Sequence, residues 1–163
     1  MKFLSTDKKN AVLQSMMDII DEKREEIIAE NKKDLDAFQR DDQALYDRLV
    51  VDGAKVDGMI QAIREVKEQD DPVGKEISSR TLDTGLKIIN KTDPFGTIMI
   101  IYESRPDVTI EAAVLAFKAN NKILLKGGRE AYNSNKVLVK CWHEALKANE
   151  LGDEWIKMLE MNR

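Results

Sequence analysis

The sequence predicts an α/β fold in which helices and a β-hairpin precede strand–helix–strand–helix units of an open parallel sheet. Three observations support it. Apolar residues recur at helical spacing in residues 1–71, and short apolar runs flank a turn in residues 72–93. In residues 94–163, two continuous apolar runs are each followed by a helical pattern. We therefore expect a helical segment, a hairpin and a sheet-forming lobe with these bounds, and 163 residues are enough to bury a real core.

The composition narrows the classes of function. Lys and Arg number 26 against 30 Asp and Glu, so a net charge of −4 gives no general attraction to nucleic acid or to an anionic membrane. The single cysteine, Cys141, excludes an intramolecular disulfide framework and a cysteine-rich zinc site. No apolar run approaches the roughly 20 residues that span a bilayer. We therefore expect a cytoplasmic protein without nucleic-acid or membrane partners.

The helical segment contains three helical patterns and a net charge of −6, whose side chains we expect on solvated faces. Ser5 or Thr6 is the expected N-cap of the first helix. The polar run 31–36 either continues this helix or starts another that runs to Arg40. The apolar face of the first pattern is Leu13, Met16, Met17, Ile20, Ile27 and Ile28, and that of the third is Val56, Met59, Ile60, Ile63 and Val66.

The period of the apolar pattern changes after Pro72 and Gly74, which end the helical segment. Two short strands around a turn at residues 83–85 predict the hairpin. The later runs 97–102 and 122–126 are apolar without alternation, which is typical of strands covered on both faces. Their close spacing along the chain favours a right-handed parallel crossover.

A helical pattern follows each of these two strands. The first begins near Pro106 and contains Val108, Ala112, Leu115 and Ala116. The second is expected to be capped by Asn133 or Ser134 and to run to Ala148. Residues 155–159 then predict a third strand.

The strongest signal for a ligand site is the group Lys126, Gly127, Gly128 and Arg129 at the end of the second buried strand. In open parallel sheets, ligands bind beyond the carboxyl ends of the strands, where glycines let a ligand approach the backbone. The two cations suit a ribose 2′-phosphate and therefore NADP rather than NAD. The alternative is an ordinary strand-to-helix loop whose glycines supply a positive φ. Neither standard glycine-rich phosphate fingerprint is present.

A second signal, Glu103, Ser104 and Arg105, follows the first buried strand. The guanidinium of Arg105 offers a planar fork for a carboxylate or phosphate, and Pro106 restricts the backbone that presents it. The alternative is an ion pair between Arg105 and either Glu103 or Asp107.

Groups able to perform catalysis are scarce in this sequence. His143 is the only histidine and lies inside a predicted helix, which favours a surface or packing role. Cys141 lies in the same helix, away from any helix amino terminus that would lower its pKa, so we expect a buried structural thiol. No set of residues has metal-ligand spacing. We assign no catalytic residue and no metal site.

Taken together, these motifs resemble gamma-glutamyl phosphate reductase (glutamate-5-semialdehyde dehydrogenase), a branch of the aldehyde dehydrogenase superfamily. The residues that carry the resemblance are Pro94-Phe95-Gly96, Tyr102-Glu103-Ser104-Arg105-Pro106 with Val108-Thr109, Leu125-Lys126-Gly127-Gly128-Arg129-Glu130-Ala131, and Ser134-Asn135. Weaker resemblance extends back to Ser5, so the whole chain is covered.

The resemblance implies the amino-terminal portion of such an enzyme, with part of a Rossmann-like cofactor lobe and an oligomerisation hairpin. It implies NADPH-dependent reduction of L-glutamyl 5-phosphate to glutamate 5-semialdehyde with release of phosphate, in proline biosynthesis, by a homo-oligomer. It places Lys126, Gly127, Gly128, Arg129 and Ser104 at the cofactor and Glu103 and Arg105 at the substrate.

The family's nucleophilic cysteine belongs to a later lobe, and Cys141 does not match its context. We therefore expect a partial chain that is inactive alone. The alternative is a non-catalytic nucleotide-binding or protein-interaction module derived from that family. A parallel sheet of two or three strands leaves an apolar face and an unpaired edge, so we also expect self-association.

Overall fold

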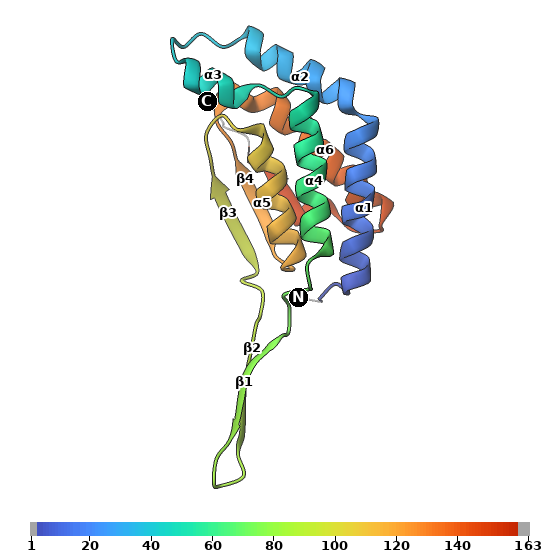
Figure 1. The fold of residues 1–163 in the computed structure, drawn as a ribbon, viewed down its shortest axis with the longest axis vertical. Helices are drawn as coiled ribbons and strands as arrows, with labels where there is room; N and C mark the ends of the chain where they lie inside the picture. The colour runs from blue at the N-terminus through green and yellow to red at the C-terminus, as the bar shows by residue number, and fades with distance from the viewer. Residues whose placement is uncertain (1–2, 160–163) are drawn as a thin grey trace.

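The computed structural model describes residues 3–159 (Figure 1). Six helices and five strands are found in this part of the chain. In chain order they are α1 (Thr6–Glu22), α2 (Arg24–Asp36), α3 (Gln43–Leu49), α4 (Gly53–Glu68), β1 (Glu76–Thr81), β2 (Lys87–Lys91), β3 (Thr97–Ile101), α5 (Pro106–Lys118), β4 (Lys122–Lys126), α6 (Tyr132–Ala148) and β5 (Ile156–Met158).

Side-chain caps explain where three of the first four helices begin, α1, α3 and α4. The hydroxyl of Ser5 caps α1, and the carboxylates of Asp42 and Asp52 cap α3 and α4 by accepting backbone N–H groups. Lys23 separates α1 from α2, and residues 31–36 continue α2 to its end. None of the helices within residues 3–159 is long and apolar enough to cross a membrane.

The helical segment and the later helices share one hydrophobic core with the three-stranded sheet. In Figure 1 the helices lie on one side of that sheet. The largest buried apolar side chains come from all six α-helices and from β4: Leu13, Met16, Ile20, Ile27, Leu49, Met59, Ile63, Ile110, Phe117, Ile123 and Trp142.

The three-stranded sheet has the order β3-β4-β5 and is parallel throughout. Ile98 pairs with Ile123 and Ile100 with Leu125, and the side chains of Ile100, Ile123 and Leu125 pack in or against the core. The expectation that the first strand is covered on both faces is wrong for the described residues. The side chains of β3 alternate between half-buried and exposed, and Ile101 is 70% exposed, because the helices cover only one face.

Two expectations about the later helices also need correction. Leu115, one of the apolar residues in the predicted helical pattern, is 55% exposed, because the packed face of α5 runs through Ile110, Ala113 and Phe117. Neither Asn133 nor Ser134 caps α6, which begins at Tyr132 and has no side-chain cap at its own N-cap position.

The hairpin β1–β2 projects away from the body of the molecule (Figure 1). Its strands pair antiparallel, and every residue in them is exposed. Gly85 has a positive φ in the turn, as the turn chemistry requires. At the base, Asp71 accepts hydrogen bonds from Lys9 and Thr6 of α1, which joins the hairpin stem to the helices.

Candidate functional site

The two groups of residues that the sequence singled out lie together at the carboxyl ends of β3 and β4. The N–H of Tyr102 donates to the carbonyl of Lys126 over 3.0 Å, which extends the pairing of the two strands. A side chain at Gly128 would lie 3.4 Å from the carbonyl carbon of Glu103 and 3.5 Å from the nitrogen of Ser104. The parallel sheet therefore brings both strand-end loops to one edge, where such folds bind ligands.

Close packing favours glycine strongly at position 127, whereas at Gly128 the nearest atom is the flexible end of the Glu130 side chain. A Cβ atom at Gly127 would overlap Nδ2 of Asn135 and lie 3.1 Å from the ring of Tyr102, and one at Gly128 would lie 2.8 Å from Oε2 of Glu130. The alternative that these glycines supply a positive φ is wrong, because within the described residues the positive-φ glycines are Gly74, Gly85 and Gly96.

A buried chain of hydrogen bonds supports the packing around Gly127. Thr109 donates its hydroxyl proton to Oδ1 of Asn135 over 2.7 Å, so the hydroxyl of Tyr102, also 2.7 Å from Thr109, is the donor to Thr109. Burial raises the pKa of Tyr102. Since the phenol is neutral and its proton is already donated, Tyr102 acts here as a packing group.

The cationic side chains at the strand ends differ in whether an acidic residue already pairs with them. Arg105 pairs with Asp107, with Nη2 2.8 Å from Oδ2. Burial alone would raise the pKa of Asp107, but Arg105 and Lys55 outweigh it and hold that pKa below its ordinary value. Lys126 and Arg129 form no ion pair with another residue in the described part of the chain. The charges of these two side chains are therefore unpaired and available to an anionic ligand, whereas the charge of Arg105 is shared with Asp107.

The strand-end motif in the sequence includes Glu130 but predicts neither a role for it nor the residues that hold it. Its Oε1 pairs with Nη2 of Arg40 over 2.5 Å, and its Oε2 accepts a long hydrogen bond of 3.3 Å from the buried hydroxyl of Ser104. Glu130 thereby connects three loops. The local pattern carries no signal for this, because Arg40 lies 90 residues away.

The sulfhydryl and the imidazole of α6 both lie in structural surroundings. Cys141 is buried, and burial raises its pKa to about 12, so it is a thiol at neutral pH. His143 lies 2.8 Å from the carbonyl of Ile156 through Nε2, which must carry the proton because a carbonyl only accepts. Both roles agree with the structural interpretation of the sequence.

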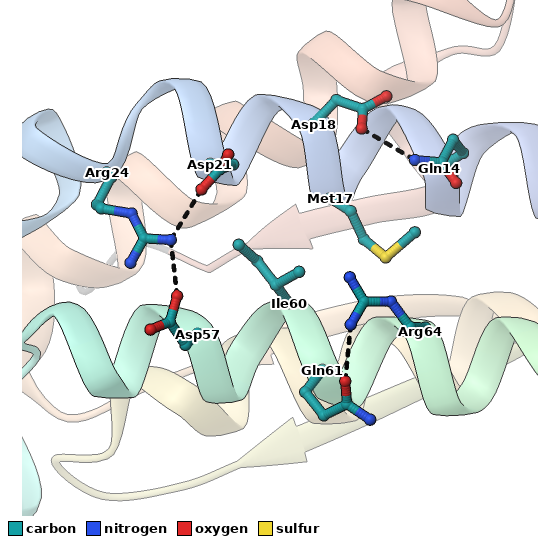
Figure 2. A pocket seen from close by; sticks show the side chains of 9 residues that line it. All are labelled: Gln14, Met17, Asp18, Asp21, Arg24, Asp57, Ile60, Gln61 and Arg64. Atoms are coloured by element: carbon teal, nitrogen blue, oxygen red, sulfur yellow. Dashed lines mark hydrogen bonds and ion pairs between the residues drawn. The ribbon is translucent and has the colours of Figure 1, made fainter.

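A groove of about 510 Å³ lies between α1 and α4, but none of the strand-end residues lines it (Figure 2). Arg24 donates to Asp21 and Asp57 across this groove over 2.8 and 2.7 Å, and Gln14 donates to Asp18. Its polar side chains are therefore bonded to one another, and we do not assign it a ligand.

Comparison with solved structures shows which fold class this chain has. An acetylating aldehyde dehydrogenase from Geobacillus thermoglucosidasius superposes with a TM-score of 0.66 at 14% identity, covering 98% of this chain and 33% of that chain. This likeness concerns the fold alone. The chain has an aldehyde dehydrogenase-like α/β fold, which confirms the predicted fold class.

Closer relatives identify the family. The gamma-glutamyl phosphate reductase structure from Thermotoga maritima has a TM-score of 0.90 and 38% identity, covering 98% of this chain and 39% of that chain. The curated gamma-glutamyl phosphate reductase of Leptospira interrogans is 40% identical over 153 residues, which is 93% of this chain. The chain is thus a homologue of the gamma-glutamyl phosphate reductases, and the predicted resemblance is confirmed. It spans about 37% of the length of the curated relatives it matches. No family model matches it.

Proposed function

We propose that this chain is part of an NADPH-dependent reductase that converts L-glutamyl 5-phosphate to glutamate 5-semialdehyde and releases phosphate, in proline biosynthesis. The homology to reductases of that name supports the activity. The observation that carries the site is the pair of cations at the carboxyl end of β4, Lys126 and Arg129, which have no ion-pair partner within residues 3–159.

These residues fit the phosphorylated end of NADPH. Lys126 and Arg129 would hold the ribose 2′-phosphate, because cations recognise a phosphate by charge-assisted hydrogen bonds. Gly127 and Gly128 keep the strand-end loops in contact, and Ser104 lies at the neighbouring strand end. When bound, the cofactor supplies the hydride that reduces the acyl group.

We propose Glu103 and Arg105 as the residues nearest the substrate. Arg105 is half-exposed, and Asp107 occupies only Nε and one terminal nitrogen of its guanidinium. The remaining N–H groups can donate to the carboxylate or phosphate of an acidic substrate.

The chemical step needs a group that these residues lack. Reduction through a thioester requires a thiolate, and Cys141 is a buried thiol with a pKa of about 12. The nucleophile must therefore come from outside these 163 residues, and we expect the isolated chain to bind without catalysing. One buried unpaired cysteine also suits the cytoplasm, which we propose as the location.

We further propose that the protein is a homo-oligomer and that the hairpin is its contact element. The supporting observation is the exposure of large apolar side chains on a two-stranded arm: Ile77, Leu82, Leu86, Ile88 and Ile89. The same observation supports the alternative function, a non-catalytic protein-interaction module that keeps the nucleotide site.

The experiment that tests the site is a titration of the purified chain with NADPH and with NADH, followed by nucleotide fluorescence. We expect saturable binding of NADPH in preference to NADH. Arg129→Glu should weaken NADPH binding by about tenfold or more, since it replaces an attractive charge with a repulsive one. Arg80→Glu, the same change on the exposed strand β1, should leave binding unchanged. Equal affinity for both nucleotides, or an unaffected Arg129→Glu, would contradict the proposed site.

A further inference from the structure

Helix α6 begins directly after the loop that carries the cations, yet it lacks a cap of its own. Its N-cap residue is Ala131, and its first turn contains no acidic residue. The first N–H groups of a helix have no partner within the helix and need acceptors from elsewhere. The partners for α6 come from α2, about 100 residues earlier in the chain.

Asp34 of α2 supplies these acceptors. One oxygen of its carboxylate accepts from the backbone and side-chain nitrogens of Asn133, over 3.0 and 2.8 Å. The other accepts from the backbone nitrogen and hydroxyl of Ser134, over 2.7 and 2.6 Å. Asp34 is only 4% exposed, so this carboxylate is buried at the amino end of α6 with four donors.

Asn31, one turn earlier on α2, completes this contact. Its Nδ2 donates to the hydroxyl of Ser134 over 3.0 Å and to the carbonyl of Leu49, and its Oδ1 accepts from the N–H of Val51. Burying a polar group costs free energy unless the group has a hydrogen-bond partner. Here the polar groups of Asn31, Asp34 and Ser134 are partners of one another and of nearby backbone groups. These hydrogen bonds therefore fix the position of α2 relative to the start of α6.

The charge of Asp34 also decides how an external anion can bind. The amino end of a helix attracts anions through its N–H groups and its dipole. At α6, an internal carboxylate already occupies the N–H groups of Asn133 and Ser134. A phosphate at this edge of the sheet cannot use these two N–H groups, so its charged partners are the side chains of Lys126 and Arg129.

Those two side chains lie on a segment whose far end is held by α2 and the loop after it. Residues 127–131 run from the end of β4 to the first turn of α6, which Asp34 fixes. Within that stretch, Glu130 is paired with Arg40, from the loop that follows α2. Arg129 is thus next to one anchored residue and five positions before another, Ser134.

We propose that Asp34 is a positioning residue for the nucleotide site: by capping α6 from α2, it holds the segment 126–131 so that Lys126 and Arg129 converge on one phosphate. This inference rests on the proposed NADPH site and extends that site into the helical segment. Asp34 does not touch the nucleotide and acts through the segment it holds.

The test compares Asp34→Asn with Asp52→Asn. Both changes remove the charge of a capping aspartate, but Asp52 caps α4 by accepting from Lys55 over 2.8 Å and has no bond to the segment. Hydrogen exchange of peptides covering residues 126–135 is measured together with NADPH titration. We expect Asp34→Asn to speed exchange in this segment and to weaken NADPH binding by about fivefold or more, and Asp52→Asn to do neither.

Other outcomes separate the proposals. If Asp34→Asn speeds exchange uniformly over the chain, or leaves NADPH affinity unchanged while the segment loosens, Asp34 is only a structural cap and the inference is overturned. If the unaltered chain binds no NADPH, the proposed function fails, and an unchanged exchange of residues 126–135 in Asp34→Asn would overturn the positioning role as well. Ser134→Ala, which removes one donor to Asp34, replaces Asp34→Asn if that variant does not fold.

Discussion

Lys9 has no exposed surface, and its ammonium donates to both carboxylate oxygens of Asp71 over 2.9 and 2.8 Å. Lys118 is almost as buried and donates to Oδ1 of Asn10 and to the carbonyl of Lys67. At the scale of single residues, charged side chains enter this core only with their acceptors. Removing one partner leaves an uncompensated buried charge, which is why such pairs are sensitive positions.

The first prediction concerns the pH dependence of the Lys9–Asp71 pair. Burial alone would raise the pKa of Asp71, but hydrogen bonds from Lys9, Thr6 and the N–H of Val73 outweigh it, so the pKa lies below its ordinary value. Such a group stabilises the fold above the pKa of the unfolded state, about 3.9, and this contribution is lost as the pH falls through the lower folded pKa.

We expect Asp71→Asn to destabilise the protein by about 3 kcal/mol at pH 7, because Lys9 is left buried without a counter-charge. Urea unfolding should show the same difference from the unaltered protein at pH 7 and pH 5 and a smaller difference at pH 3, where the carboxylate begins to protonate. A difference that is constant over this range would contradict the assigned shift.

The second prediction concerns Gly127. An alanine there would overlap the amide of Asn135 and crowd the ring of Tyr102, so Gly127→Ala should destabilise by about 1–3 kcal/mol. The matched control is Gly58→Ala in α4, where a new Cβ meets nothing within 4 Å. That change should stabilise by about 1 kcal/mol, because alanine is the better helix former. Urea midpoints that move in the same direction for both variants would refute the packing argument.

At the scale of secondary-structure elements, the helices and the hairpin are stabilised differently. Each of α1, α4, α5 and α6 buries one face in the common core. The hairpin β1–β2 buries nothing, and isolated two-stranded sheets are marginally stable in water. It is held at its base, where the hydroxyl of Thr92 donates to the carbonyl of Pro72 and accepts from the N–H of Lys75.

The third prediction follows from this exposure. Ile89→Asp places a charge on an apolar position of the hairpin that is 42% exposed in the monomer. We expect the change to reduce self-association by about tenfold while leaving the thermal midpoint of the monomer within about 2 °C, since the side chain is not in the core. Leu115→Asp, an exposed apolar position on α5, is the control. Equal effects of both changes in equilibrium sedimentation would argue against the hairpin as the contact.

At the scale of the whole molecule, the sheet has one covered and one open face. On the open side of β3, Met99 and Ile101 are 48% and 70% exposed, and Phe95, just before the strand, is 92% exposed. Parallel sheets normally have both faces covered, and an unpaired strand edge promotes association. The described residues therefore present a surface that is unusual for an isolated monomer.

The fourth prediction is that the 163-residue chain self-associates at tens of micromolar. Sedimentation velocity should show species larger than the monomer, and Ile101→Lys should shift the distribution toward the monomer, because it charges the open face. A single sharp monomer peak for the unaltered chain would contradict this expectation.

Local patterns in the sequence predicted most elements and their order, but they placed Ile27 and Ile28 on the first helix and missed the break at Lys23 that separates α1 from α2. Helical periodicity located α1, α4, α5 and α6, the turn at residues 83–85 defined the hairpin, and two apolar runs defined β3 and β4. The same strand ends pointed to Lys126 and Arg129, whose availability the structure supports. These inferences succeed because period, caps and turn residues are properties of neighbouring positions in the chain.

Tertiary structure decided what depends on contacts between distant residues. Asp34 caps α6 from 100 positions away, Arg40 reaches Glu130 across 90, and Asn135 with Tyr102 makes Gly127 necessary. The sequence also could not predict that one face of β3 is open, because an apolar run indicates burial without showing which neighbouring elements provide it. The sequence by itself determined which segments fold and which cations end the strands. Packing between α2 and α6 decided how those cations are held, because a buried carboxylate must find its donors wherever the fold brings them.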